Sequence, residues 1–253
     1  MPLPVRRTGN PGLNEKTFTS LPRLGIGIEG MTLKGTIDKS FLLLIVLMVS
    51  ALWPWTQFTS SGGDIQVVLP TMMVGVLGGF VLALIMSFKP ALAPILAIPY
   101  AALEGLALGG ISAAFELRYH GIAIQAVGLT FGVLAVLLIA YRMRLIRVTA
   151  QFRAMVIGAT FGIALFYVAA MVLNLFHVSV PVLYAATPLG IGLSLVVVGI
   201  AALNLVLDFD LIERGVAGGA PKYMEWYAAF GLMVTLVWLY LELLRLLSKV
   251  RRN

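Results

Sequence analysis

Seven long apolar stretches follow a polar amino-terminal segment, and short polar or charged connections separate them. About 20 predominantly apolar residues suffice to cross the hydrocarbon core of a bilayer as an α-helix. The stretches lie roughly at residues 40–55, 67–88, 91–115, 122–141, 154–176, 182–207 and 223–247. The pattern therefore predicts an all-α polytopic membrane protein built as a seven-helix transmembrane bundle. The first stretch is short, and Trp53 and Trp55 at its end fit an interfacial anchor.

Composition supports the same class of protein. Hydrophobic residues make up 60% of the chain and charged residues 11%, whereas about 25% of a soluble domain is charged. The absence of cysteine excludes a disulfide framework and a thiolate metal site. The net charge of +7 is interpreted as a record of membrane topology, because basic residues gather in cytoplasmic loops, and we expect no nucleic-acid partner.

The polar segment at residues 1–38 is rich in proline and glycine. We expect it to form a flexible cytoplasmic tail before a transmembrane domain at residues 39–253. The tail lacks the pattern of a cleavable signal peptide, so the first span itself directs insertion.

Lysine and arginine concentrate in the tail and in alternate connections, which places the amino terminus in the cytoplasm. We therefore expect a multi-pass protein of the inner cell membrane. Basic residues also occupy the carboxyl end, which would lie outside after seven crossings: Arg245, Lys249, Arg251 and Arg252. Six crossings with a re-entrant last segment is the alternative.

Small residues recur four positions apart within the spans, which allows helices to approach closely in lipid. The clearest pairs are Gly75/Gly79, Gly105/Gly109 and Gly158/Gly162.

Carboxylates inside the spans are the candidate functional groups. An acid in the hydrocarbon region costs about 2.5 to 3.5 kcal/mol on insertion scales, so one placed there is a functional candidate. Glu104 lies 13 residues into the third stretch, which is about 20 Å along a helix. A glutamic acid hydrogen-bonded within the bundle is the structural alternative for this residue.

Two aspartates near the end of the sixth stretch point in different directions. Residues two positions apart on a helix are separated by about 200°. Asp210 has Arg214 at i+4, the spacing of a local ion pair near the cytoplasmic interface. Asp208 instead follows Asn204 by one turn on an otherwise apolar face, which predicts a buried polar site.

The last stretch supplies the candidate partners of Asp208. Glu225 lies at a similar distance from the turn of the hairpin and is the first candidate, whereas Glu242 lies about 25 Å further along, with Arg245 at i+3. Two carboxylates in a low dielectric repel each other and share a proton, and their oxygens also suit calcium. Asp208 and Glu225 are thus predicted to bind calcium transiently, in competition with protons. We expect no resident cofactor, with calcium as the transported ion.

Other functional classes lack their required residues. A retinal protein needs a lysine deep in its last helix, but Lys222 and Lys249 lie at its ends. His120 and His177 fall in expected outer loops, which removes support for a histidine metal centre or a serine hydrolase. No glycine loop of the phosphate-binding kind is present. We expect that the protein is not an enzyme.

Three segments resemble the Bax inhibitor-1 (transmembrane Bax inhibitor motif, YccA-like) family, in its bacterial branch. They are LDFDLIE at 207–213, LYLELLRLL at 239–247, and the step from Glu104 to Gly105. The resemblance covers about residues 31–250. It implies a seven-helix bundle with a central helix surrounded by the others, and a pH-sensitive calcium leak.

The resemblance also implies a pair of aspartates on the last two long helices, linked to a basic residue near the end of the second. Asp208 matches the first aspartate. The second falls near Thr235, so Glu225 or Glu242 would have to substitute for it. At the end of the second span only Lys89 is available in place of an arginine.

The leading hypothesis is a pH-sensitive cation (calcium) leak channel or ion-homeostasis protein gated by buried carboxylates, with the lipid bilayer, calcium and protons as its partners. The alternative is a non-conducting interaction protein that modulates a membrane protease or another membrane protein. A proton-coupled small-solute transporter is a third class, although no clear inverted repeats are visible.

Overall fold

The computed structural model describes residues 30–177, 180–181 and 185–252. Over these residues the chain forms seven long helices and the short 3-10 turn η1 (Pro90–Leu92). The long helices are α2 (Leu33–Ser60), α3 (Ile65–Phe88), α4 (Ala93–Glu116), α5 (Ile122–Arg142), α6 (Ala150–Leu175), α8 (Pro188–Ala217) and α9 (Met224–Arg252). Each is long and apolar enough to cross a membrane, which confirms the predicted all-α, seven-helix class.

The first helix begins earlier than the predicted boundary at residue 39. Thr32 adopts an extended conformation, and its hydroxyl accepts a hydrogen bond from the Gly35 amide at 3.0 Å, which caps α2 at Leu33. The helix also continues through Pro54 to Ser60, so the two tryptophans lie within it and not at its end. Residues 1–29 of the expected tail lie outside the described residues.

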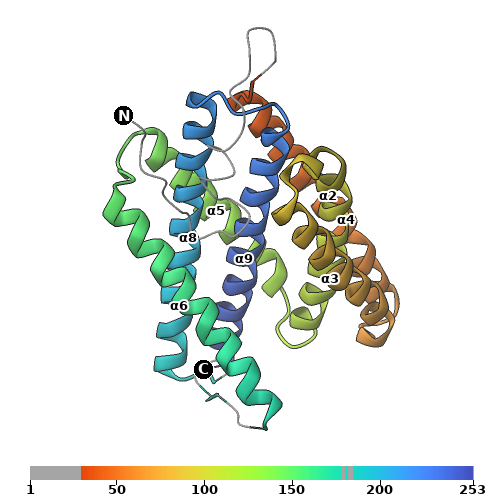
Figure 1. The fold of residues 1–253 in the computed structure, drawn as a ribbon. Helices are drawn as coiled ribbons and strands as arrows, with labels where there is room; N and C mark the ends of the chain where they lie inside the picture. Colours follow the sequence, from red (N-terminus) through yellow and green to blue (C-terminus); the bar gives the residue numbers. More distant parts are fainter. Residues whose placement is uncertain (1–29, 178–179, 182–184, 253) are drawn as a thin grey trace.

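Helix α9 is the most buried of the seven spans. It packs against α2, α4, α5 and α8, while α3 packs mainly on α4, and α6 on α8. Figure 1 shows α9 between a group formed by α2, α3 and α4 and a group that contains α6 and α8. The expectation that one helix is surrounded by all the others stays a prediction.

Glycines bring α4 close to its two neighbours. A Cβ at Gly75 would lie 2.5 Å from the Ala107 amide nitrogen, and one at Gly109 would collide with the Ala51 carbonyl oxygen. The glycines spaced four residues apart therefore predicted the close packing of α4 against α3 at Gly75 and against α2 at Gly109. It was wrong for Gly158 and Gly162, because no described atom would lie within 4 Å of an added Cβ there.

The two ends of the described chain lie at opposite ends of the bundle. The Met31 amide donates to the Ala220 carbonyl at 2.6 Å, which places the start of α2 beside the α8–α9 connection. Arg251, near the end of α9, donates to the His120 carbonyl in the α4–α5 connection and to the Gln125 side chain, at 2.5 and 2.8 Å. Since α9 is one continuous helix of 29 residues, the arrangement agrees with seven crossings and not with a re-entrant last segment.

Candidate functional site

Asp208 is enclosed between α8 and α9, with 2% of its surface exposed. Its carboxyl group interacts with the hydroxyl of Thr235, which is also buried and belongs to α9. Its Oδ2 atom has no hydrogen-bond partner among the described residues. The Thr235 hydroxyl in turn lies 3.3 Å from the Gly231 carbonyl oxygen, one turn earlier. The prediction of a buried polar group at Asp208 is confirmed, and its neighbour is a threonine.

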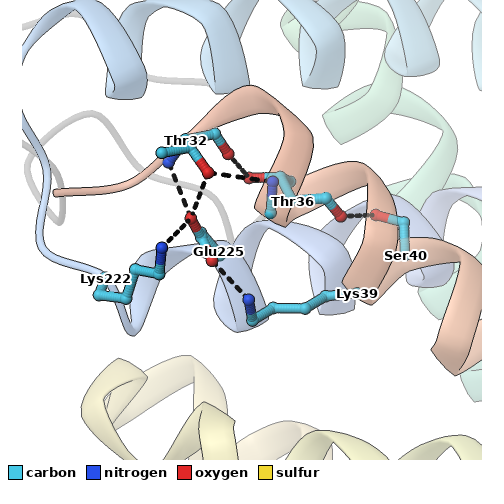
Figure 2. A network of polar contacts seen from close by, with 7 residues as sticks. Thr32, Thr36, Lys39, Ser40, Lys222 and Glu225 are labelled. Atoms are coloured by element: carbon cyan, nitrogen blue, oxygen red, sulfur yellow. Dashed lines mark hydrogen bonds and ion pairs between the residues drawn. The ribbon is translucent and has the colours of Figure 1, made fainter. Parts of the chain in front are cut away.

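Glu225 is fully buried in a polar network at the start of α9 (Figure 2). The amide and the hydroxyl of Thr32 both donate to Glu225 Oε1 at 2.8 Å. Lys39 Nζ lies 2.5 Å from Oε2, and Lys222 Nζ lies 3.4 Å from Oε1. Gly35 leaves the space for this carboxylate, since a Cβ at that position would collide with it. The network ties α9 to the first turn of α2.

The expected pair between Asp208 and Glu225 is therefore corrected. No hydrogen bond or ion pair joins these two residues in the part of the chain that the structure describes. Their similar depth in the hairpin was a sound inference, but Glu225 is directed toward α2, where Lys39, Lys222 and the α2 cap satisfy its carboxylate. The two carboxylates consequently do not form the transient calcium site that the sequence pattern suggested.

Asn204 belongs to a different contact. Its Nδ2 atom donates to Thr160 Oγ1 on α6 and to the Ile200 carbonyl, both at 2.8 Å. The Thr160 hydroxyl donates to the Val156 carbonyl at 2.8 Å. Asn204 thus links α8 to α6, and no hydrogen bond joins it to Asp208 among the described residues.

Asp210 forms the local ion pair that its spacing predicted. Arg214 Nη2 lies 2.6 Å from Asp210 Oδ2. A second arginine, Arg153 on α6, approaches the same oxygen at 2.9 Å. Sequence reasoning missed Arg153, although its position in the first turns of an apolar helix was a signal. Glu213 lies one turn after Asp210 on α8, and its carboxylate accepts a hydrogen bond from the Tyr141 hydroxyl of α5 at 2.7 Å.

A cavity of about 950 Å³ lies beside these carboxylates, between α2, α5, α8 and α9. Helices α2 and α5 form its walls, and residues of α8 and α9 line it between them. Phe209 and Leu236, which follow Asp208 and Thr235 in the chain, are part of the lining. The contact between Asp208 and Thr235 therefore lies next to the cavity.

Glu242 occupies the opposite half of α9. Arg245 Nη1 lies 2.9 and 3.0 Å from its two carboxylate oxygens, which confirms the predicted pair at i+3. The Tyr167 hydroxyl, on α6, donates to Glu242 at 3.0 Å and lies 2.5 Å from Arg245 Nη1. These partners connect α9 to α6, so Glu242 has no place beside Asp208.

Glu104 lies between α3 and α4. Its side chain is hydrogen-bonded to Tyr100, one turn earlier. A Cβ added at Gly79 of α3 would lie 3.1 Å from Glu104 Oε2, so the missing side chain makes room for the carboxyl group. The Tyr100 ring meets Phe230 of α9 edge-on, with 4.9 Å between centroids. Tyr100 thus connects Glu104 to α9.

A family model described as Bax inhibitor 1 like matches residues 6–252. The chain belongs to the Bax inhibitor 1 like family. Because the match spans nearly the whole chain, it confirms the resemblance that three short segments had suggested. Comparison with curated proteins and with solved structures returned no match. The bacterial branch stays a prediction.

Thr235 lies where the resemblance to the family implies an acidic residue. The resemblance implies a second aspartate near this position, and the structure brings this threonine to Asp208. Neither Glu225 nor Glu242 takes the place of that aspartate. Lys89, the expected basic residue, is exposed at the end of α3 and forms no side-chain hydrogen bond or ion pair with a described residue. This member of the family therefore has seven long helices in its described residues and, at the contact between α8 and α9 near Asp208, one carboxyl group facing a threonine.

Proposed function

We propose that this membrane protein is a pH-sensitive cation leak channel that conducts calcium and contributes to ion homeostasis. The observation that carries the proposal is the buried carboxyl group of Asp208, which faces Thr235 and keeps one oxygen without a partner among the described residues. This group lies between α8 and α9, the two longest helices of the described residues, where a change of charge alters how the two helices pack.

Protonation changes what Asp208 offers to Thr235. An ionised carboxylate only accepts hydrogen bonds, whereas a neutral carboxyl group also donates one, and a hydroxyl does both. Since the Thr235 hydroxyl also reaches the Gly231 carbonyl, a proton on Asp208 changes which group donates in this chain of contacts. Carboxylate oxygens are also preferred ligands of calcium. Protons and cations thus compete for one buried group.

The adjacent cavity supplies one half of a path. It reaches Phe209 and Leu236, which directly follow Asp208 and Thr235 in the chain. In the proposed mechanism this contact closes the path, and separation of α8 from α9 at this level opens it. Asp210 is already bound to two arginines, so it contributes to the wall and not to the gate.

The proposed orientation follows the basic residues. The end of the bundle that carries the α5–α6 connection, with Arg142, Arg144 and Arg147, is assigned to the cytoplasm of a bacterial inner membrane.

Calcium flux into liposomes tests the proposal. Purified protein is reconstituted, the external pH is stepped from about 8 to about 6, the range over which a buried carboxyl group can change its charge, and flux is read with an enclosed dye. We expect flux that rises on acidification and loses its pH dependence in Asp208→Asn. Asp38→Asn, which neutralises an exposed carboxylate of α2, is the matched control and should behave as the unchanged protein. Absence of flux from folded protein, together with recovery of a stable partner, would support the non-conducting interaction protein instead.

A further inference from the structure

The cavity between α2 and α5 extends along the helices over about the thickness of one lipid leaflet. Its lining on α2 runs from Leu33 to Leu44. Eleven residues of α-helix correspond to about 16 Å, about half of a 30 Å hydrocarbon core. The cavity thus begins at one end of the bundle and reaches roughly the depth at which an acyl chain ends.

The deep part of the cavity is apolar and accessible from the side. Ile37 and Phe41 on α2, and Leu138 on α5, line it and remain 57%, 66% and 48% exposed. The two hydroxyl groups in the α2 wall, of Thr36 and Ser40, donate to carbonyl groups of the same helix at 2.9 Å. This wall therefore offers hydrocarbon to an occupant, and both of its side-chain hydroxyl groups already donate within α2 or to its cap.

Arginines surround the outer end of the cavity. Arg142, Arg144 and Arg147 line it at the end of α5 and in the connection to α6, and all three are exposed. No hydrogen bond or ion pair joins the guanidinium group of any of the three to another described residue. Asp210 and Glu213 also line the cavity, but their carboxylates already accept from two arginines and from Tyr141. Cationic groups therefore exceed carboxylates at this end.

We infer that the cavity binds one anionic phospholipid of the surrounding leaflet. Its phosphate lies among Arg142, Arg144 and Arg147, and an acyl chain extends between α2 and α5 along Phe41 and Leu138. An arginine fork matches a phosphate group, and a volume of about 950 Å³ lies at the upper end of the usual range for ligand pockets. The inference does not rest on the proposed channel function.

Retention of defined lipids by the full-length protein tests this site. Detergent-solubilised protein is titrated with dioctanoyl phosphatidylglycerol or with dioctanoyl phosphatidylcholine, and bound lipid is counted by native mass spectrometry. We expect one phosphatidylglycerol to be retained in preference to phosphatidylcholine. A basic residue near a membrane surface is worth about fivefold in affinity, so the triple variant R142Q/R144Q/R147Q should weaken retention of phosphatidylglycerol by at least about tenfold. The double variant R118Q/R252Q, which removes exposed arginines at the opposite end, is the matched control and should change nothing.

A second pair of variants tests the acyl-chain part and does not depend on charge. Leu138→Trp fills the cavity and should reduce retention of both lipids, whereas Leu129→Trp, at a similarly exposed position of α5 outside the cavity, should not. Equal retention of the two lipids by the unchanged protein would overturn the inference, as would a triple variant that retains phosphatidylglycerol normally. Complete displacement of the lipid by inorganic phosphate would also overturn it, because the site would then recognise an anion alone.

Discussion

Introducing a second carboxylate at position 235 is the most direct test of the contact between Asp208 and Thr235. In Thr235→Asp, the new side chain would face Asp208 in a region where both residues are almost completely buried. Two unit charges about 4 Å apart repel by about 4 kcal/mol at an effective dielectric constant of 20. That is a large fraction of the total stability of a protein, so the pair must keep one proton between its two members.

The variant should therefore change how flux depends on pH. One carboxyl group gives a transition that follows the binding of one proton, whereas a coupled pair titrates in two separated steps. We expect a single sigmoidal curve of calcium flux against pH for the unchanged protein. For Thr235→Asp we expect a curve that is broader and has two steps, because one proton leaves the pair before the other.

Thr235→Asn is the control, because asparagine has nearly the shape of aspartate and carries no charge. Flux from both variants is measured in the same liposomes over the same range of pH, after thermal unfolding has shown that each is folded. Identical curves for the aspartate and asparagine variants would refute the reasoning, since position 235 would then have no electrostatic influence on the gate.

Three further substitutions concern contacts that join α8 and α9 to other helices. Glu225→Gln leaves Lys39 and Lys222 without their carboxylate, so it should lower the free energy of unfolding by about 2 kcal/mol. Thermal unfolding in detergent measures this loss, and Asp38→Asn is the control that should show no change. Gly35→Ala should destabilise the protein by about 1–3 kcal/mol, because the new methyl group collides with the Glu225 carboxylate. Gly128→Ala has open space around it and should be neutral or stabilising. Equal effects of the two substitutions would contradict the described packing. Asn204→Leu removes the hydrogen bond to Thr160 on α6 and should lower the free energy of unfolding by about 1 kcal/mol. The pH midpoint of calcium flux should stay unchanged. A shifted midpoint would show that the Asn204 amide takes part in gating.

The number of spans and the local ion pairs were predictable from the sequence, because both depend on neighbours along one helix. The apolar stretches are long enough to identify every long helix of the described residues. The pairs of Asp210 with Arg214 and of Glu242 with Arg245 follow from the positions that share a helical face. The start of α2 was missed because its first turns are polar, and only the cap at Thr32 marks it.

Contacts between helices were less accessible, because sequence gives depth but not the direction in which a helix faces. Glu225 and Asp208 have comparable depths, yet Glu225 turns toward Lys39, which lies 186 positions earlier in the chain. The same limit hid Arg153 as a partner of Asp210. Thr235 could be found only through the family pattern, since a threonine in an apolar helix carries no signal of its own.

The distribution of contacts along α9 separates stability from gating. Glu225 ties its first turn to α2, and Lys249 ties its last turns to α8 through the Gly190 carbonyl and Ser194, at 3.0 and 2.9 Å. Thr235 lies between these two attachments. Because both ends of α9 are held, separation from α8 near Asp208 requires a local bend or rotation and not a departure of the whole helix. Loss of an end contact should therefore lower the unfolding temperature and leave the pH midpoint of flux in place, whereas substitutions at the middle contact should shift the midpoint first.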